Sequence, residues 1–514
     1  MLLADDIGGN HLFAQVLGAT TLGINGMMIT VEVDIANGLP GFDIVGLPDA
    51  SVRESRERVR AAIKNSGFTF PGQRIIVNLA PADLKKDSSG LDLPIAIGIL
   101  IASDQLASEE CYNTVFISEL SLEGKLRAVS GILPMTITLG NNNLANVFVA
   151  PDNAQEAAIS DLVKVFAPQT LAETVSHLQG LQRLTEKSFL NVSTAQDSTD
   201  VDFYEVQGQL TAKRALEIAA AGGHNVLMIG APGSGKTMLA RRLPTILPAM
   251  SAKESLEVTQ ICSVAGLLHG HNGLISKRPF RSPHHTISDA GLVGGGRIPR
   301  PGEVTLSHNG VLFLDELPEF RRSVLEVLRQ PLEDGEVTIA RVNASLSFPA
   351  KFMLVAAMNP CPCGWSGDSE RECSCSAHDI RQYQKKISGP LLDRIDLHVH
   401  VPRLKYQEMV DSAQQESSAA IRQRVEDARV RQLNRLKKYG LFCNAQMGRR
   451  HLKATCSLMP DAEFLLKQAF EKMNLSARGY DRIIKVGRTI ADLSNEDKIS
   501  ASHIAEAIHF RNQG

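Results

Sequence analysis

The pattern of apolar and polar residues predicts strands and helices that alternate through residues 1–175. Residues 29–35 alternate strictly between apolar and polar side chains, which is typical of a half-buried strand, and residues 74–79 predict a further strand. Residues 51–66 carry apolar side chains at helical spacing and end before Gly67, so an amphipathic helix with a glycine stop is expected. The apolar run at residues 91–103 predicts another helix.

Three short apolar runs follow in the middle of the chain. Residues 226–229, 311–314 and 352–358 predict buried strands, and each run is followed directly by glycine or by polar side chains. Residues 336–348 alternate and turn near Asn343, which predicts a hairpin. The expected domains are an α+β domain at 1–178, a polar linker at 179–200, an α/β core at 201–402 and a helical domain at 403–514.

The first of these strands runs into the spacing of a phosphate-binding P-loop. Gly230 is followed after four residues by Gly235, Lys236 and Thr237, and a helix is expected to begin at Lys236. Small residues let backbone N–H groups converge on phosphate oxygens at the positive end of that helix. The lysine is expected to reach the β- and γ-phosphates, and the threonine hydroxyl to bind Mg²⁺. The residues expected to hold ATP are Gly230, Ala231, Pro232, Gly233, Ser234, Gly235, Lys236, Thr237 and Met238.

Polar side chains after the other two strands complete a predicted hydrolysis site. Asp315 is expected to hold Mg²⁺ through its water shell, and Glu316 to orient the attacking water. Asn359 is expected to polarise the water beside the γ-phosphate, and capping of the strand end is its alternative role. ATP and Mg²⁺ are therefore the expected cofactors.

Four of the eight cysteines cluster shortly after this site. They are Cys361, Cys363, Cys373 and Cys375. Two close pairs on a polar loop suit a tetrahedral thiolate site, so Zn²⁺ is favoured and reduced free thiols are the alternative. The C-x-C spacing is less usual than C-x-x-C, and His378 is a candidate substitute ligand.

The charge balance restricts where nucleic acid could bind. The formal net charge is −2, which excludes a generally basic nucleic-acid binder, so any DNA contact must come from local patches. The candidates are the hairpin that carries Arg341 and a glycine-containing loop, with ordinary solvated loops as the alternative. The cations of that loop are Lys277, Arg278, Arg281, Arg297 and Arg300. A third basic run, residues 422–438, is expected to be the solvated face of a helix.

Nothing in the sequence predicts a membrane segment or secretion. The longest apolar run contains Pro94 and is too short to span a bilayer, and residues 1–6 lack the basic leader of a signal peptide. Clustered cysteines fit a reducing compartment better than a disulfide framework. A cytoplasmic location is therefore expected.

Two stretches of the first domain, residues 86–90 and 119–131, resemble the Lon-protease-like, ribosomal-S5-type α+β domain. The resemblance implies a Ser–Lys dyad with Ser88 in the place of the nucleophile, but Met135 occupies the position of the catalytic lysine. A thioether cannot accept the serine proton, so the domain is expected to be non-catalytic.

Long motifs across essentially the whole chain resemble the ComM/YifB family of the magnesium-chelatase-like AAA+ ATPases. They lie at residues 38–48, 278–288, 359–364 and 388–396. The resemblance implies an AAA+ P-loop ATPase core with a helical lid. It also implies that Arg394 reaches the nucleotide of a neighbouring subunit and that Arg478 is a second sensor on the lid. An ion pair with Asp393 or Asp396 is the alternative role of Arg394.

The same resemblance implies a homo-hexameric helicase that uses ATP for branch migration during natural transformation and homologous recombination. Single-stranded and branched DNA and recombination proteins are the implied partners, and the MCM helicases are implied kin. The alternative is the ATPase subunit of a metal chelatase, which is disfavoured because those subunits lack the Lon-like domain. A nucleotide-binding scaffold is a third class, disfavoured by Glu316 and Arg394, which only hydrolysis requires.

Overall fold

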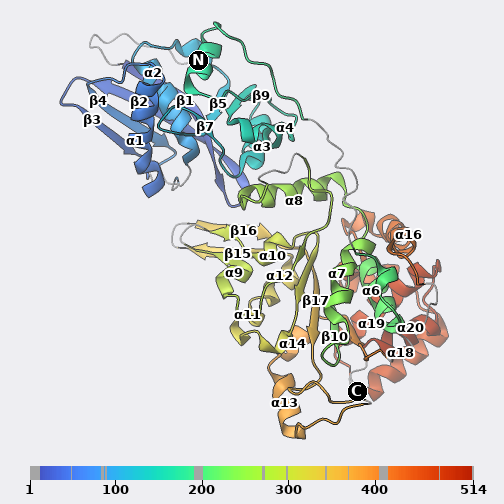
Figure 1. The fold of residues 1–514 in the computed structure, drawn as a ribbon. Coiled ribbons are helices and arrows are strands. Elements are labelled where there is room, and N and C mark those ends of the chain that lie inside the picture. Colours follow the sequence, from blue (N-terminus) through green and yellow to red (C-terminus); the bar gives the residue numbers. More distant parts are fainter. Residues whose placement is uncertain are drawn as a thin grey trace. The chain divides into compact units, whose positions relative to one another are not determined.

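A computed structural model describes residues 12–47, 49–82, 86, 89–189, 201–268, 273–296, 299–341, 344–368, 370–404, 415–473 and 475–511 (Figure 1). The chain divides into two compact units. The amino-terminal unit comprises Met1–Thr194, Leu256–Ile275 and Arg297–Arg300. The second unit comprises Ala195–Ser255, Ser276–Gly296 and Pro301–Gly514.

A mixed seven-stranded sheet forms the centre of the amino-terminal unit. Its strands are β1 (Leu12–Leu22), β2 (Asn25–Ala36), β3 (Gly41–Val45), β4 (Arg74–Ala80), β5 (Thr114–Ile117), β8 (Asn146–Val149) and β9 (Lys164–Phe166), in the order β3-β4-β2-β1-β5-β8-β9. The ribbon β6 (Glu119–Leu120) and β7 (Leu126–Arg127) lies outside this sheet. From Ile29 onward every second residue of β2 is buried, which confirms the half-buried strand that alternation predicts. The strand predicted at residues 74–79 is confirmed as β4.

The amino-terminal unit also contains helices, several of which pack against the sheet. They are α1 (Ala50–Asn65), η1 (Ser89–Leu91), α2 (Asp92–Ala102), η2 (Ser108–Cys111), α3 (Ile132–Asn141), η3 (Pro151–Asn153), α4 (Ala154–Ala158), α5 (Leu171–Leu178) and the later part of α8 (Ala252–Val264). The helices predicted at 51–66 and 91–103 are confirmed as α1 and α2. Every residue of α2 is buried, and its one charge, Asp92, pairs with Arg58 at 2.7 Å. A segment from the middle of the chain joins this unit through Ser263, whose carbonyl accepts from the Gly131 N–H at 3.0 Å.

The second unit contains a five-stranded sheet in which all strands are parallel. Its strands are β10 (Val226–Ile229), β11 (Phe280–Arg281), β14 (Val311–Leu314), β17 (Met353–Met358) and β18 (Leu397–His400), in the order β11-β14-β17-β10-β18. The three buried strands that the sequence predicts are confirmed as β10, β14 and β17, and they are neighbours. A ligand site is expected beyond their carboxyl ends, which meet at one edge of the sheet.

The remaining short strands include the predicted hairpin. They are β12 (Gly294–Gly295), β13 (Arg300–Pro301), β15 (Glu336–Arg341) and β16 (Ala344–Pro349). Strands β15 and β16 pair antiparallel, which confirms the hairpin. The predicted turn residue, Asn343, lies outside the described residues.

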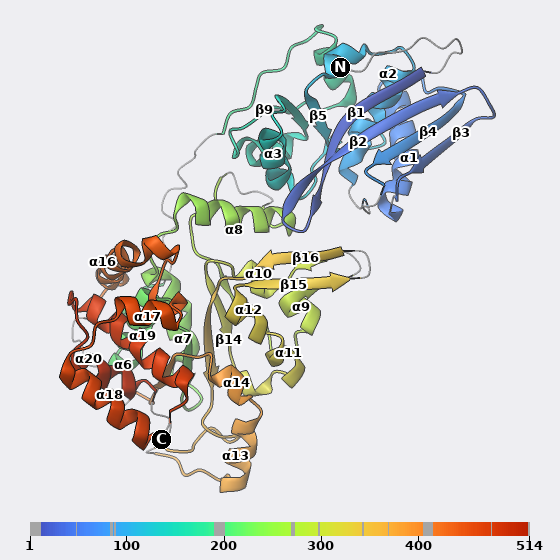
Figure 2. The same cartoon turned by 180° about the vertical axis from the view of Figure 1, so that it is seen from behind.

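Helices surround the parallel sheet, and those near the carboxyl terminus gather on one side of it (Figure 2). Near the sheet lie η4 (Phe203–Glu205), α6 (Leu210–Gly222), α7 (Lys236–Ile246), α9 (Asp289–Val293), α10 (Glu303–Leu306), η5 (Leu317–Glu319), α11 (Arg322–Glu326), α12 (Arg329–Asp334), α13 (Ala377–Lys385) and α14 (Gly389–Leu392). The carboxy-terminal helices are α16 (Ser418–Leu436), η6 (Lys437–Tyr439), η7 (Asn444–Gln446), α17 (Arg449–Thr455), α18 (Pro460–Lys472), α19 (Ala477–Leu493) and α20 (Ala501–His509). Within the described residues, no helix has both the length and the apolar composition needed to cross a membrane.

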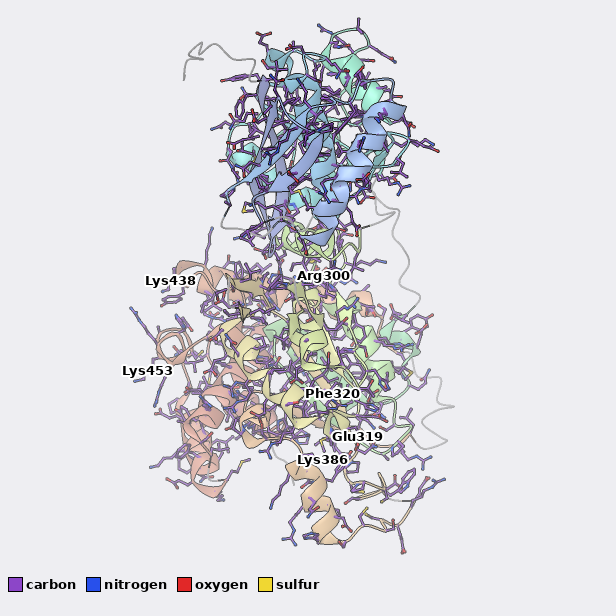
Figure 3. The ribbon with its side chains drawn as sticks, turned by 90° about the vertical axis from the view of Figure 1, so that its left-hand side faces the viewer. Arg300, Glu319, Phe320, Lys386, Lys438 and Lys453 are labelled. Carbon is purple, nitrogen blue, oxygen red and sulfur yellow. The ribbon has the colours of Figure 1, made fainter. Side chains whose placement is uncertain are left out.

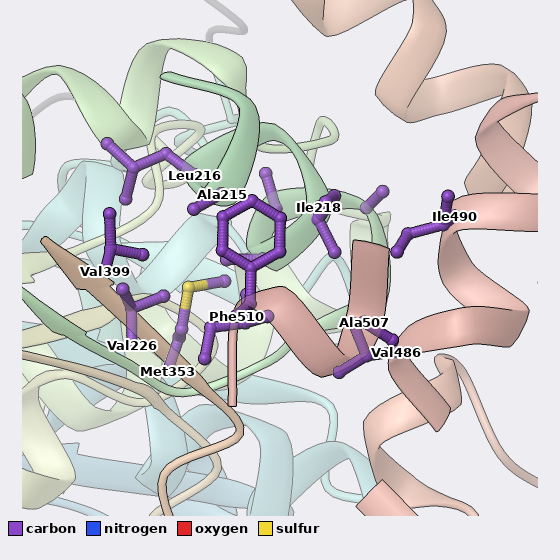
Figure 4. Packing of buried hydrophobic residues seen from close by; sticks show 14 of the residues in the cluster. Ala215, Leu216, Ile218, Val226, Met353, Val399, Val486, Ile490, Ala507 and Phe510 are labelled. Atoms are coloured by element: carbon purple, nitrogen blue, oxygen red, sulfur yellow. The ribbon is translucent and has the colours of Figure 1, made fainter. Parts of the chain in front are cut away.

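One apolar core joins the sheet to the carboxy-terminal helices (Figure 4). Val226 and Val399 come from two neighbouring strands, whereas Val486, Ile490 and Phe510 come from the end of the chain, and all five are buried. Burial of such side chains contributes roughly 1.5–3 kcal/mol each. The helical domain is therefore part of the second unit rather than a separate body.

The expectation that residues 422–438 form a solvated face is wrong for Arg429 and Arg435 of α16. Arg429 donates to the carbonyl oxygens of Ala221 and Ala220 at 3.1 and 2.9 Å, at the carboxyl end of α6. Arg435 donates two hydrogen bonds to the buried Asp492, at 2.8 and 2.6 Å. Cations at a helix carboxyl end satisfy unpaired carbonyl groups and the negative end of the dipole. These arginines hold helices together.

Candidate active site

The P-loop connects β10 to α7 and depends on its glycines. Gly233 and Gly235 have φ angles of +77° and +91°, a backbone conformation in which other residues are strained. A Cβ atom at Gly230 would lie 2.2 Å from the carbonyl oxygen of Val401. The spacing that predicts a phosphate loop therefore coincides with positions that accept only glycine.

Lys236 lies at the first position of α7 and is buried. Its Nζ donates to the carbonyl oxygens of Gly230 at 2.7 Å and Ala231 at 3.0 Å, and to Oδ1 of Asn359 at 3.3 Å. Burial lowers the pKa of Lys236, and the nearby carboxylate of Asp315 opposes that shift. The structure thus brings the P-loop lysine and the predicted asparagine together across neighbouring strands.

The predicted Mg²⁺ residues are also adjacent. Thr237 Oγ1 donates to Oδ2 of Asp315 at 2.7 Å, and Oδ1 of the same carboxylate accepts from the Glu316 N–H at 2.9 Å. The Ser234 hydroxyl is buried and has no hydrogen-bond partner within the described part of the chain. A buried hydroxyl without a partner is costly, and hydroxyl and carboxylate oxygens are ligands that Mg²⁺ prefers. These residues therefore fit a magnesium–nucleotide complex.

Glu316 adopts an unusual backbone conformation for a residue with a side chain. Its φ is +52°, and its carboxylate is 59% exposed. Left-handed conformations of non-glycine residues cost on the order of 1–3 kcal/mol and concentrate at functional sites. His285 Nδ1 lies 3.5 Å from the Glu316 carboxylate. No role is predicted for His285 from the sequence, although it lies within the motif at residues 278–288.

Arg394 and Arg478 share one carboxylate, that of Glu333 in α12. Arg394 Nη2 pairs with Oε2 of this residue, and Arg478 Nη2 lies 3.9 Å from its Oε1. The alternative ion pair of Arg394 with Asp393 or Asp396 is absent from the described residues. Neither arginine contacts the P-loop in that same part of the chain. The structure therefore brings the two arginines together at Glu333, which no sequence motif marks, and leaves them apart from the phosphate loop.

The backbone that carries Arg394 is held firmly. Its carbonyl oxygen accepts from the Asn225 side chain at 2.9 Å, and the next carbonyl accepts from Arg482 at 3.0 Å. The Asp396 carboxylate pairs with His224 Nδ1 at 3.2 Å. Burial would raise the pKa of Asp396, but the hydrogen bond with His224 and the charge of Arg482 outweigh burial and lower it. The loop is thus fixed even though the Arg394 side chain contacts a half-exposed carboxylate.

The four clustered cysteines lie together as thiols. Cys361 Sγ is 3.4 Å from Cys363 Sγ and 3.7 Å from Cys373 Sγ, and the latter two sulfurs are 3.6 Å apart. Cys375 completes a group whose sulfurs all lie within 4.8 Å of one another. Four sulfurs bound tetrahedrally to zinc at about 2.3 Å lie roughly 3.8 Å apart, so the group fits zinc. His378 is not a member of this group.

The cysteine loop touches the P-loop, a contact that the sequence did not predict. A Cβ atom at Gly364 would lie 2.6 Å from Cδ of Pro232 and 3.9 Å from Cγ of Asn359. The φ of Gly364 is +85°. Glycine between the two cysteine pairs therefore lets the loop lie against the nucleotide site.

The basic patches that the sequence proposes for DNA are only partly available. Arg278 pairs with Glu254 at 3.2 Å, and Arg281 pairs with Glu303 at 2.7 Å. Arg297 and the side chain of Arg341 lie outside the described residues. The two ion pairs could not be predicted from the sequence, because the glutamates lie far along the chain from their arginines.

Two positions bear on the comparison with a Ser–Lys dyad. Ser88 lies outside the described residues, and Met135 is buried in α3.

Comparison with known proteins gives matches along most of the chain. Family models described as "Magnesium chelatase, subunit ChlI", "Subunit ChlI of Mg-chelatase" and "Magnesium chelatase, subunit ChlI C-terminal" match residues 202–409, 31–153 and 415–511. The chain is 44% identical to the competence protein ComM of Haemophilus influenzae over 507 residues, which cover 97% of each chain. It is 43% identical to the uncharacterized protein YifB of Salmonella typhimurium, over 95% of each chain. A magnesium-chelatase 38 kDa subunit of Rhodobacter capsulatus is 27% identical over 31% of this chain and 50% of its own length.

Proposed function

This chain belongs to the ComM/YifB family, and we propose that it is an ATP-driven hexameric helicase that catalyses DNA branch migration during natural transformation. The convergence of Lys236, the Thr237–Asp315 pair and Asn359 at one edge of a parallel sheet carries the ATPase part of the proposal. Similarity over nearly the whole length to a protein named for competence supports incoming DNA as the substrate.

The roles of the site residues follow from their contacts. When bound, ATP supplies the phosphoryl group and Mg²⁺ neutralises charge on its oxygens. Lys236 would hold the β- and γ-phosphates, and Thr237 and Asp315 would hold the metal. Glu316 would orient water from its exposed position, with Asn359 polarising that water.

Arg394 would act on the nucleotide of the next subunit, and Arg478 would be a second sensor on the lid. Arg394 and Arg478 meet at Glu333 and do not contact the chain's own P-loop within the described residues. An arginine delivered from a neighbour adds positive charge where the transition state develops negative charge. This supports a ring in which each site is completed by the adjacent chain.

The remaining assignments also belong to the proposal. The domain at residues 1–178 would be a non-catalytic Lon-like module, followed by the linker at 179–200, the ATPase core at 201–402 and the lid at 403–514. The protein would act in the cytoplasm with recombination proteins. A chelatase motor is the second candidate, favoured by the family-model descriptions but disfavoured by the short coverage of the chelatase subunit.

One set of assays tests the proposed function. ATP hydrolysis by the full chain should rise when single-stranded or branched DNA is added. Lys236→Ala should abolish ATP-dependent activity, whereas Glu316→Gln should bind ATP and stall. Hydrolysis that no DNA stimulates would contradict the DNA motor, and normal turnover by the Glu316 variant would contradict its assigned role.

The cysteine cluster is proposed to hold one Zn²⁺ per chain. Elemental analysis of the purified protein measures this directly, with a Cys363→Ser/Cys373→Ser variant as the control. Loss of zinc from the double variant is expected because two of four thiolate ligands are removed. A parent protein that contains no metal yet is folded and hydrolyses ATP would contradict the zinc site and support free thiols.

A further inference from the structure

A cleft of about 780 Å³ lies beside the predicted catalytic residues of the second unit. One wall is the segment 318–322, which begins two residues after Glu316. The other wall is α13 with the following Lys386, which comes directly after the cysteine loop. Glu319, Phe320 and Lys386 lie close together in Figure 3. The cleft is therefore formed by the two segments that follow the catalytic strands β14 and β17.

The charge of this cleft is strongly positive. Its lining includes Arg322, Arg381, Lys385 and Lys386 but only one carboxylate, that of Glu319. Glu319 pairs with Lys386 at 3.3 Å. Within the described residues, the other three cations form no ion pair. The α13 wall thus presents Arg381 and Lys385 without a carboxylate at ion-pair distance among the described residues, and the other wall presents Arg322, whose charge helps to lower the pKa of Glu326.

The cations of α13 lie on one face of the helix. Lining residues His378, Arg381, Gln382 and Lys385 follow one another at intervals of one, three or four positions. Positions four apart in an α-helix are separated by about 6 Å along its axis and share a face. Arg322 extends the row on the opposite wall. Such a row suits a ligand with repeated negative charges rather than a single anion.

We propose that this basic cleft binds the sugar-phosphate backbone of a DNA strand and links its occupancy to ATP hydrolysis. The proposal rests on the proposed function, since it presumes that the chain binds DNA. It adds a contact surface that is separate from the glycine-containing loop and from the hairpin.

The properties of the lining favour a phosphate backbone. The three cations without an ion pair in the described part of the chain are exposed, as is usual for sequence-independent contacts that release counterions. Phe320 is 4% exposed, so it offers no face on which a base could stack. Backbone contacts, without base recognition, are what a motor that moves along DNA requires.

A structural path leads from the cleft to the active site. Lys386 Nζ lies 5.5 Å from the centre of the Tyr383 ring. Burial raises the pKa of Tyr383 to about 12, and the neighbouring backbone N–H of Asn359 opposes that rise only weakly, so this hydroxyl lies beside the Asn359 backbone and stays neutral. On the other wall, the peptide N–H of Glu319 donates to the carbonyl of Glu316 at 2.8 Å. A strand in the cleft would therefore contact the segment that follows Glu316 directly, and it would act on the Asn359 segment through Lys386 and Tyr383.

The test is the salt dependence of DNA binding by the full chain, measured with a fluorescent single strand. Arg381→Gln/Lys385→Gln removes two cations from one wall. Lys467→Gln/Lys472→Gln removes two exposed cations from α18 and is the matched control. Removing one cation that binds a phosphate lowers the slope of log K against log salt by about 0.7, so a decrease of about 1.4 is expected. That change corresponds to roughly 25-fold weaker binding at about 0.1 M salt.

A second variant predicts a change of the opposite sign. Glu319→Gln removes the only carboxylate of the lining and releases Lys386. Tighter binding with a slope steeper by about 0.7 is expected, because one more cation can contact phosphate. DNA-stimulated hydrolysis should fall in the Arg381→Gln/Lys385→Gln variant and not in the α18 control.

The outcomes separate the cleft from the proposed function. If the parent protein binds DNA but the Arg381→Gln/Lys385→Gln variant keeps its slope, the cleft proposal is overturned while the DNA motor stands. If that variant changes only its sedimentation, the cleft contacts another subunit and the proposal is equally overturned. A parent protein that binds no DNA overturns both.

Discussion

Two sets of arginines in the second unit show how differently one side chain can be used. Arg429 and Arg435 of α16 bind groups inside the fold, the first helix-end carbonyl groups and the second the buried Asp492. Arg394 and Arg478 instead share the carboxylate of Glu333, which is 55% exposed. A sequence shows all four as basic residues on or near helices.

This comparison indicates that the exposure of the group bound by an arginine determines whether that arginine suits a structural or a catalytic role. Breaking a buried charge pair leaves an uncompensated charge and destabilises the fold, whereas an exposed pair contributes little. Arg394 and Arg478 can exchange their carboxylate for another anion at small cost. The α16 arginines cannot, since their partners are groups inside the fold that a solvent-borne anion cannot replace. The first set therefore suits catalysis and the second suits structure.

The largest expected effect is the loss of hydrolysis in Arg394→Ala. Comparable arginines contribute about a thousandfold or more to the rate, so turnover should fall by about that factor while ATP binding and the melting temperature stay near those of the parent. Steady-state hydrolysis and nucleotide titration measure this.

Mixing distinguishes action between subunits from action within one. Rings of Arg394→Ala and Lys236→Ala chains contain some interfaces with both an intact P-loop and an intact arginine, so activity should partly return. A mixture that forms rings and stays inactive would leave Arg394 as a salt-bridge residue only.

Arg435→Ala should act on stability instead. Asp492 is 1% exposed and keeps Arg488 as a second ion-pair partner at 3.0 Å. Loss of the two hydrogen bonds from Arg435 should therefore cost about 2 kcal/mol in the free energy of unfolding, less than the cost of leaving a buried charge with no partner. Urea unfolding measures the change, and Arg431→Ala, whose partner Asp497 is 97% exposed, is the matched control with an expected change below about 0.5 kcal/mol. Equal losses in the two variants would remove the distinction between arginines with buried partners and arginines with exposed partners.

Acid should weaken the loop that carries Arg394. The folded-state pKa of Asp396 is lowered, so its stabilising effect is present above its unfolded pKa of about 3.9 and is lost as the pH falls below that value. Urea unfolding of the parent and of Asp396→Asn between about pH 3 and pH 7 is the measurement. The stability difference between them should shrink toward the acidic end of that range, and a constant difference would contradict the lowered pKa.

The smallest expected effect on stability belongs to Glu333→Gln. Its carboxylate is 55% exposed, whereas Arg394 is 12% exposed and keeps its hydrogen bond to the Pro390 carbonyl, so the free energy of unfolding should fall by about 1 kcal/mol or less. Thermal unfolding, with Arg435→Ala run in parallel, checks this. A loss as large as that of Arg435→Ala would mean that the Glu333 contacts are structural, and the two sets of arginines would no longer differ.

Local chemistry made the P-loop and its strand predictable, because glycine conformation, a following helix and a buried strand all act within a short stretch of chain. Asp315 and Asn359 could be placed for the same reason, since each follows an apolar run and parallel strands end at one edge. Glu333 and Tyr383 could not be found, because their partners lie far along the chain. The prediction for the α16 arginines was wrong because the spacing of polar residues identifies a polar helix face but not the α6 carbonyl groups that this face contacts.

The path of the chain between the two units has a consequence for anyone who would shorten this protein. Leu256–Ile275 lies between the P-loop and Asp315 in sequence, yet it belongs to the amino-terminal unit, where Ser263 bonds to Gly131 and Glu156. A deletion that ends at residue 200 would leave that segment with unpaired backbone groups and uncovered side chains. The two units therefore cannot be separated by cutting the chain at one position. A single gene fusion or truncation could not remove or replace the amino-terminal unit as an independent module.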